Sequence, residues 1–142
     1  MSLGSVFIQG QWRAAQGQPF VNTNPVGKAQ IWAGQEATAE DVQLASESAR
    51  QAFPQWAVTP LEQRIQIVEE FARLLKENQQ HLAEVISQET SKPLWETLTE
   101  VQAMIGKAAI SIRAYQQRTG ESSTDMPDGK ATLRHRPHGV LA

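Results

Sequence analysis

Two histidines near the end of the chain are the first side chains that could do chemistry. His135 and His138 are three positions apart, with Arg134 and Arg136 on either side of the first. A bound metal ion would need further ligands, and the adjacent cations would oppose its charge. The pattern therefore predicts no metal site.

The same segment carries a small basic patch. Lys130, Arg134 and Arg136 could together contact a phosphate group. No aromatic side chains alternate with these cations, as they do in many segments that bind nucleic acid. A solvated strand face is the favoured interpretation, and no nucleic-acid partner is expected.

Three glutamates raise the question of acid–base catalysis. Glu96 and Glu100 are one helical turn apart, and Glu89 lies upstream of both. Lys107 is too far along the chain to pair closely with either of the later two. A ladder of charges on a helix surface is the favoured interpretation.

The sequence lacks the residues that usually carry out covalent catalysis or bind a nucleotide cofactor. The chain has no cysteine, which excludes disulfides, thiolate zinc sites and a cysteine nucleophile. No nucleophile elbow surrounds a serine, and neither common kind of glycine-rich phosphate loop is present. We therefore assign no catalytic, cofactor-binding or metal-binding residue in this sequence.

Length and charge limit the number of domains and the kinds of partner that we expect. The 142 residues are enough for one domain of ordinary size. Thirteen basic and fifteen acidic residues give a net charge of −2, so nothing attracts the chain globally to nucleic acid or to an anionic membrane. No apolar run approaches the roughly 20 residues of a membrane span, and the N-terminus lacks the features of a secretory signal. We expect a cytoplasmic protein without membrane contact.

The helices are organised around the segment Glu89-Thr90-Ser91-Lys92-Pro93. Proline is tolerated in the first turn of a helix but not inside one, so Pro93 marks a helix start. Apolar residues at steps of three and four predict an amphipathic helix on each side of this segment. After it they are Leu94, Leu98, Val101, Ile105, Ala108, Ile112 and Tyr115, and before it Leu61, Ile65, Val68, Ala72, Leu75, Leu82, Val85 and Ile86.

An earlier helix has its own start and stop signals. Thr38, with Asp41 three positions later, predicts a capped start. Pro54 disfavours helical backbone in the residue before it, so this helix should end near Phe53.

The remaining helix boundaries follow from similar signals. The segment Thr59-Pro60-Leu61-Glu62 predicts a start with a threonine cap, and that helix should run to about Glu77. Asn78 can cap the next helix. The helix after Pro93 should reach about Arg118, where Gly120 suits a left-handed stop.

Short strands open and close the chain. Alternating segments separated by turn residues predict a β-meander within residues 6–33. Met126-Pro127-Asp128-Gly129 is a tight turn between two further strands, and Val140-Leu141-Ala142 is typical of the start of a buried parallel strand. Because a chain rarely ends on entering a core, we interpret the sequence as part of a longer one.

Several motifs in order resemble the N-terminal part of the NAD(P)-dependent aldehyde dehydrogenases. Each motif alone is weak, but together they cover essentially the whole chain. One departure is Ser91, where the family usually has glycine, so a serine would have to adopt any left-handed turn at some cost. The motifs are Phe7-Ile8-Gln9-Gly10-Gln11-Trp12, Asn24-Pro25-Val26-Gly27, Ala52-Phe53-Pro54-Gln55-Trp56, Glu89-Thr90-Ser91-Lys92-Pro93 and Arg136-Pro137-His138-Gly139-Val140.

Further segments resemble, more narrowly, the succinylglutamate semialdehyde dehydrogenases, which oxidise N-succinylglutamate semialdehyde with NAD in arginine degradation. Those segments are Ala103-Met104-Ile105, Ala109-Ile110-Ser111-Ile112, Ala114-Tyr115, Arg118-Thr119-Gly120-Glu121, Met126-Pro127-Asp128-Gly129 and Leu133-Arg134-His135-Arg136-Pro137-His138-Gly139-Val140-Leu141.

The resemblance implies an α/β parent fold, of which this chain alone would form an α+β portion. Residues 1–120 would be the outer strands and helices of the NAD-binding domain. Residues 121–139 would be a β-arm for oligomerisation, and residues 140–142 the start of a Rossmann-like parallel sheet. A small-molecule aldehyde, a homo-oligomeric assembly and NAD are the implied partners of the parent.

The resemblance also implies that the chemistry lies elsewhere. The nucleophilic cysteine, the general-base glutamate, the oxyanion-stabilising asparagine and the glycine motif of the cofactor all lie downstream of the matching segments in the family. The chain alone should then be inactive and bind no NAD. The alternative is a stand-alone helical interaction module without enzymatic activity. A reading frame that continues toward a cysteine would favour the first hypothesis, and a natural stop codon the second.

Overall fold

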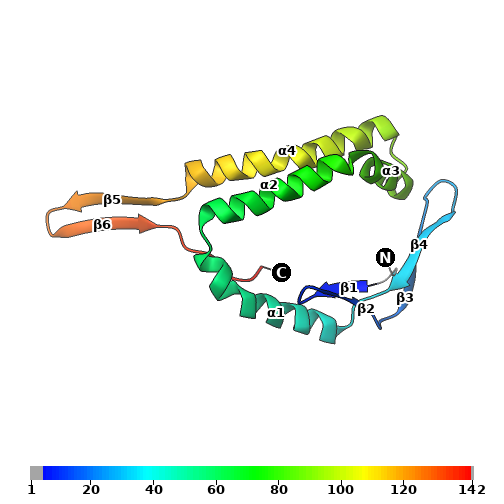
Figure 1. The fold of residues 1–142 in the computed structure, drawn as a ribbon, viewed down its shortest axis with the longest axis horizontal. Coiled ribbons are helices and arrows are strands. Elements are labelled where there is room, and N and C mark those ends of the chain that lie inside the picture. Colours follow the sequence, from blue (N-terminus) through cyan, green and yellow to red (C-terminus); the bar gives the residue numbers. More distant parts are fainter. Residues whose placement is uncertain (1–4, 142) are drawn as a thin grey trace.

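The chain forms a ring of hairpins and helices from which one hairpin projects (Figure 1). The computed structural model describes residues 5–141, and nothing is said below of the structure of the others. Antiparallel hairpins and helices together make an α+β arrangement, as expected. The elements are β1 (Ser5–Ile8), β2 (Gln11–Ala14), β3 (Pro19–Thr23), β4 (Gln30–Gln35), α1 (Ala39–Val58), α2 (Leu61–Glu77), α3 (Gln79–Thr90), α4 (Leu94–Arg118), β5 (Glu121–Met126) and β6 (Gly129–Arg134).

The expected β-meander is wrong, because the first strands form two separate hairpins. β1 pairs with β2 and β3 with β4, but β2 and β3 do not pair. The reason lies in the connector, whose polar groups extend the second hairpin. The Gly17 N–H donates to the Glu36 carbonyl at 2.9 Å, and the Glu36 N–H donates to the Gln18 carbonyl. A Cβ atom at Gly17 would stand 2.4 Å from that carbonyl oxygen, so glycine is required there.

The tryptophans of the hairpins pack against phenylalanines of the strands they pair with. The Phe7 and Trp12 ring centroids lie 5.1 Å apart, and those of Phe20 and Trp32 lie 4.8 Å apart. Such aromatic pairs stabilise a hairpin beyond the area they bury.

Helix α1 begins as predicted but ends later. Thr38 and Asp41 form the expected capping box, with the Asp41 N–H donating to Thr38 Oγ1. The predicted end near Phe53 is wrong, because α1 continues through Pro54 to Val58. Proline removes one backbone bond, and the last turn is closed by Thr59, whose hydroxyl donates to the Gln55 carbonyl at 2.9 Å.

Two predicted caps close the preceding helix instead of opening the next one. The Thr59 hydroxyl is used by α1, so α2 starts at Leu61 without a side-chain cap. The Asn78 amide donates to the Leu74 carbonyl in the last turn of α2 and likewise caps nothing in α3. The predicted end of α2 at Glu77 is confirmed.

The corner between α3 and α4 contains most of the buried side chains of the described region. Ser91 adopts the left-handed conformation with φ 62°, and Pro93 immediately precedes α4, as predicted. Ala83, Thr97 and Val101 are fully buried where the two helices cross, and the Thr97 hydroxyl donates to the Ala83 carbonyl at 2.8 Å. The other fully or nearly buried residues of the described part are Ile8 and Ala15.

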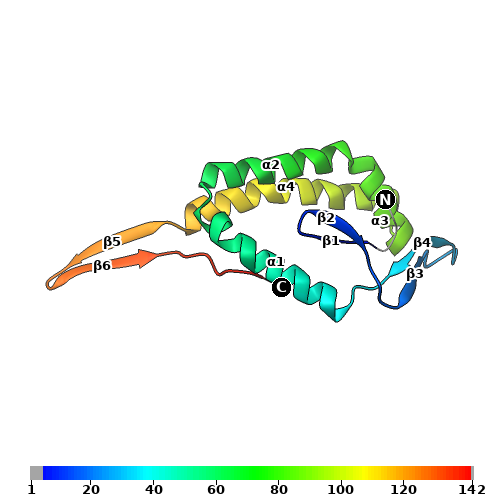
Figure 2. The same cartoon turned by 60° about the horizontal axis from the view of Figure 1, so that its bottom comes forward.

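Strands β5 and β6 form the projecting hairpin, called the arm below (Figures 1 and 2). Its turn lies at Pro127-Asp128, as predicted, and Met126 pairs with Gly129. Every residue of both strands is exposed.

After the arm, the chain turns back into the ring as irregular backbone (Figure 1). Val140 and Leu141 do not form the expected strand. A strand requires a neighbour that accepts its backbone hydrogen bonds, and none lies beside these two residues in the described part. Ala142, the last residue of that expected strand, lies outside the described residues.

Within residues 5–141, no helix is long and apolar enough to cross a membrane.

Candidate functional site

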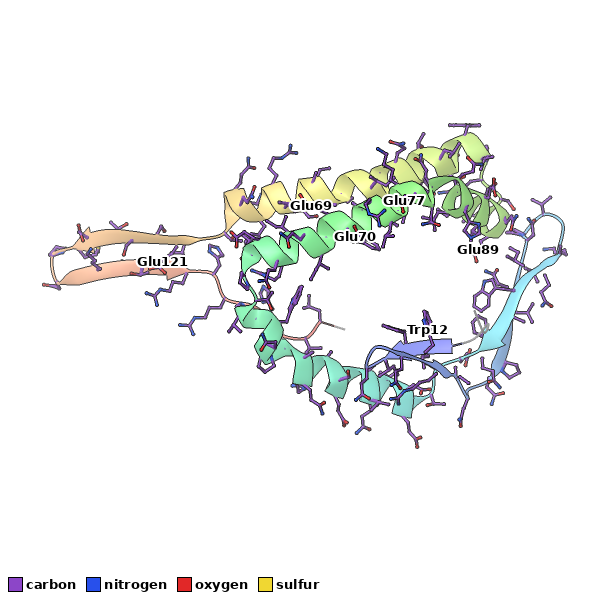
Figure 3. All side chains as sticks on the ribbon, viewed as in Figure 1. Trp12, Glu69, Glu70, Glu77, Glu89 and Glu121 are labelled. Atoms are coloured by element: carbon purple, nitrogen blue, oxygen red, sulfur yellow. The ribbon has the colours of Figure 1, made fainter. Side chains whose placement is uncertain are left out.

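The glutamates considered for acid–base catalysis do not come together as a catalytic pair. Glu89 Oε1 accepts hydrogen bonds from Asn22 Nδ2 at 2.7 Å and from Trp32 Nε1 at 3.1 Å. Figure 3 places Glu89 at the end of α3 that faces the β3–β4 hairpin. This carboxylate connects two elements instead of activating a substrate.

Lys92 is the partner of Glu100 and was missed in the sequence. Its ammonium group pairs with the Glu100 carboxylate across the α3–α4 corner. The hydrogen bond to Glu100, with the charges of Glu100 and Glu96, raises the pKa of Lys92. The two residues are eight positions apart and Pro93 lies between them, so helical spacing gave no signal for this pair.

The basic patch is neutralised within the arm. Lys130 Nζ lies 3.6 Å from Asp125 Oδ1, and Arg134 Nε lies 3.1 Å from Glu121 Oε2. Both pairs join residues directly opposite each other on β5 and β6. This agrees with the predicted solvated strand face, since two of the three cations already have carboxylate partners.

The histidines are not brought together with other metal-ligating side chains. His135 Nδ1 lies 2.9 Å from the Gly120 carbonyl oxygen and closes the base of the arm. Among residues 5–141, no cluster of three or more histidine, aspartate or glutamate side chains could hold a metal ion.

An apolar groove of about 200 Å³ lies between α2 and α4. Its one charged lining residue is Arg64, whose guanidinium carbon lies 5.7 Å from the Tyr115 ring centroid. Arg64 Nε is buried and has no hydrogen-bond acceptor among the described residues. No carboxylate or histidine lines the groove, so it is suited to apolar contact and not to catalysis. The lining residues are Trp56, Leu61, Arg64, Ile65, Val68, Ser111, Ile112 and Tyr115.

The arm has two chemically different faces. Strand pairing places Glu121, Ser123 and Asp125 opposite Arg134, Thr132 and Lys130, which makes one face fully polar. The other face carries Met126 and Leu133, which are 56% and 61% exposed. This face is the less polar of the two, because its other strand pairs contribute Ser122, Thr124, Ala131 and Gly129. An isolated two-stranded hairpin is at best marginally stable.

The described residues do not fit a dinucleotide of the kind implied by the resemblance. Such a site needs a glycine-rich turn between a parallel strand and a helix, with free N–H groups at the helix start. All strand pairs in residues 5–141 are antiparallel. In α1, the helix that follows the last strand of the N-terminal hairpins, the first-turn N–H of Asp41 is already bonded to Thr38.

Comparisons with known proteins give matches over almost the whole chain. Residues 12–142 match the model of the aldehyde dehydrogenase family. The N-succinylglutamate 5-semialdehyde dehydrogenase of Acinetobacter baylyi (strain ATCC 33305 / BD413 / ADP1) is 61% identical over 142 residues, which are 100% of this chain and 29% of that protein. The protein of the same name from Serratia proteamaculans (strain 568) is 58% identical over the same shares. The chain thus spans less than a third of the length of these curated relatives.

Solved structures show the same fold. A betaine aldehyde dehydrogenase from Staphylococcus aureus, solved in complex with NAD+, matches with a TM-score of 0.79 and 25% identity over 89% of this chain and 26% of that one. An NAD-dependent benzaldehyde dehydrogenase from Corynebacterium glutamicum matches with a TM-score of 0.77 and 25% identity, over 85% of this chain and 27% of that one.

Proposed function

The chain belongs to the aldehyde dehydrogenase family, and we propose that it forms the N-terminal, non-catalytic part of an enzyme that oxidises N-succinylglutamate 5-semialdehyde to N-succinylglutamate in arginine catabolism. The observation that carries this proposal is the 61% identity to such a dehydrogenase across the entire chain. We expect this enzyme in the cytoplasm.

NAD is the cofactor we propose for the enzyme, where it would accept the hydride of the aldehyde. We assign no part of that cofactor site to residues 5–141, whose strands pair only in antiparallel hairpins. Their role is to cover and position the polypeptide that holds it.

In this proposal, residues 1–120 form the outer layer of the cofactor domain and residues 140–142 begin its parallel sheet. Two features of the ring support this division. Trp12 points into the ring (Figure 3) and is largely exposed in the isolated chain. The α2–α4 groove leaves the buried Arg64 Nε without an acceptor that further polypeptide could supply.

Residues 121–139 serve as the oligomerisation arm in the same proposal. The arm extends away from the ring (Figure 2), and its strand pairing places the exposed Met126 and Leu133 on one face. Another subunit of a homo-oligomer would cover this face, since a projecting hairpin cannot cover it itself.

The isolated chain should not catalyse the reaction. It has no cysteine, so it cannot supply the thiolate that attacks the aldehyde in a cysteine-dependent mechanism. We expect no NADH formation from N-succinylglutamate 5-semialdehyde by the purified chain and no calorimetric heat of NAD binding at micromolar NAD.

A chimera tests the proposal directly. Residues 1–142 of this protein replace the matching residues of the Acinetobacter baylyi relative, which are 61% identical. If this chain is the corresponding part of the same enzyme, the chimera oxidises N-succinylglutamate 5-semialdehyde within about tenfold of the rate of the relative, a barrier change of about 1.4 kcal/mol.

The control is the same graft into the Staphylococcus aureus betaine aldehyde dehydrogenase, which is only 25% identical. We expect that graft to lose activity, because few side chains at the covered surfaces match. A folded but inactive first chimera would contradict the proposal and favour a stand-alone interaction module.

A further inference from the structure

The β3–β4 hairpin is attached to α3 through one carboxylate oxygen. Glu89 Oε1 accepts a hydrogen bond from Asn22 on β3 and another from Trp32 on β4. Asn22 and Trp32 are directly opposite each other in the strand pairing. A single oxygen therefore holds both strands at the same position.

No other hydrogen bond joins the hairpin to α3 in the part of the chain that the structure describes. The two strands of the hairpin are held together by their own ladder and by the Glu36 contacts described above. Helix α3, in turn, is fixed to α4 by the buried residues Ala83, Thr97 and Val101. Each side of the contact is thus internally complete without the other.

The local backbone is shaped for this contact. The strand pairing shifts register between Asn22 and Thr23, and such irregularities re-aim a side chain. Glu89 itself lies in the last turn of α3, where the helix dipole disfavours a negative charge and which contains no basic residue. The carboxylate is therefore placed against the preference of its helix, and the two N–H donors are what stabilise it there.

We propose that Glu89 is a latch that closes the ring by holding the β3–β4 hairpin on α3. When the latch is released, the hairpin swings away as a unit while both sides keep their internal hydrogen bonds. The β3–β4 hairpin lies on the side of the ring opposite the arm (Figure 1), so this movement would open the ring there. The latch is independent of the proposed enzymatic function, since it needs only residues of this chain.

The absence of cysteine allows a direct distance measurement. Val26→Cys at the exposed hairpin loop and Gln88→Cys on the exposed side of α3 accept one spin label each, with no other thiol to label. Pulsed electron spin resonance then reports the distance between hairpin and helix. An excess of unlabelled chain removes contributions from label pairs in different molecules.

The closed latch gives one narrow distance distribution. Glu89→Ala should broaden it and move its mean to longer distance, with the helical circular dichroism unchanged. Glu89→Gln keeps an acceptor oxygen and should stay close to the parent. The matched control Glu84→Ala removes an exposed carboxylate from the same helix and should change nothing.

An unchanged distribution in Glu89→Ala overturns the proposal, and so does equal broadening in Glu84→Ala. If Glu89→Ala loses its helical circular dichroism, the same distance measurement on the double variant Asn22→Ala/Trp32→Phe tests the proposal instead. This pair removes both donors and leaves α3 unaltered, so it should open the ring, and a closed ring in it overturns the latch.

Discussion

Ser91 has the most strained backbone of the α3–α4 corner. Its φ of 62° lies in the left-handed region, where a side chain costs about 1–2 kcal/mol. The corner nevertheless keeps this conformation, because the Ser91 N–H donates to the Ser87 carbonyl and the Ser87 hydroxyl donates to the Lys92 carbonyl. Neighbouring hydrogen bonds thus determine a conformation that the residue itself disfavours.

Ser91→Gly should therefore stabilise the chain. Glycine removes the left-handed cost but adds about 0.5–1 kcal/mol of unfolded-state entropy, so the net gain is about 0.5–1 kcal/mol. Urea denaturation measures it. Ser87→Gly is the control, and it should destabilise, because it weakens the helix and removes the bond to Lys92. A loss of stability in Ser91→Gly would show that the hydroxyl contributes more than the backbone strain.

Among the apolar residues of α4, Val101 should contribute most to stability. Ile105, which lies near the middle of the apolar stripe in the sequence, should contribute less. Val101 is fully buried and Ile105 only half-buried. Val101→Ala should cost about 1.5–3 kcal/mol and Ile105→Ala less, since a partly exposed site leaves a smaller cavity. Pro93→Ala should cost under about 1 kcal/mol, because first-turn proline mainly presets the backbone. Equal losses for Val101→Ala and Pro93→Ala, measured by urea denaturation, would contradict this order.

Individual side-chain partners were the least predictable from the sequence. The amphipathic helices follow from the spacing of apolar residues, and the capping box follows from a local residue pattern. The structure confirms both. The contacts of Glu89 with Asn22 and Trp32 span 67 and 57 positions, and no local pattern encodes such a distance. Thr97 was missed for a related reason: it is polar, yet it lies four residues before Val101 on the buried face.

Among the elements, α1 depends most on its first turn. No residue of α1 is fully buried, so packing stabilises this helix less and its capping box matters more. The Thr38 backbone N–H and hydroxyl donate to Asp41 and lower the pKa of its carboxyl group below the usual 3.8. The unfolded chain therefore takes up this proton at higher pH than the folded chain does.

The helical content of the chain should accordingly fall as the pH is lowered. The contribution of Asp41 is complete above about pH 4 and is lost as the pH falls through the lower folded pKa. Circular dichroism between neutral pH and pH 2 should show a larger loss for the parent than for Asp41→Asn, which has no charge to lose. Identical acid profiles for the two proteins would mean that the capping box does not contribute to α1.

The arm is the element whose role is most accessible to mutation. Leu133→Asp places a charge on its apolar face and should reduce self-association of the chain, measured by light scattering. Thr132→Asp is the matched control, because Thr132 lies on the polar face of the same strand. Equal effects of the two substitutions would argue against packing through the apolar face.

Element types were more predictable than element boundaries. Each helix start at a proline or capping box was near its predicted position. The end of α1 was not, since Thr59 closes the helix after Pro54 instead of opening α2. The prediction of a meander was wrong because the hydrogen bonds of the connector decide whether β2 and β3 pair. The alternation of apolar residues does not indicate which partners those hydrogen bonds have.

At the scale of the whole molecule, the chain exposes more surface than a compact monomer. The described structure has 11036 Å² of accessible surface, whereas a compact protein of this size has about 7,300 Å². The excess is partly apolar: Ile67, Phe71 and Leu74 form an exposed stripe along α2, 44% to 60% accessible. Contiguous apolar patches larger than a few hundred Å² rarely stay uncovered on soluble monomers.

Light scattering over a concentration series tests the central claim, that this chain is one layer of a larger assembly and cannot cover its own apolar faces. The account predicts a mass that rises with concentration, through the helical faces, the arm or both. Isolated chains should also show broad thermal unfolding. A sharp monomer mass at high micromolar concentration, together with cooperative thermal unfolding, would contradict the account, because the chain would then cover its own core.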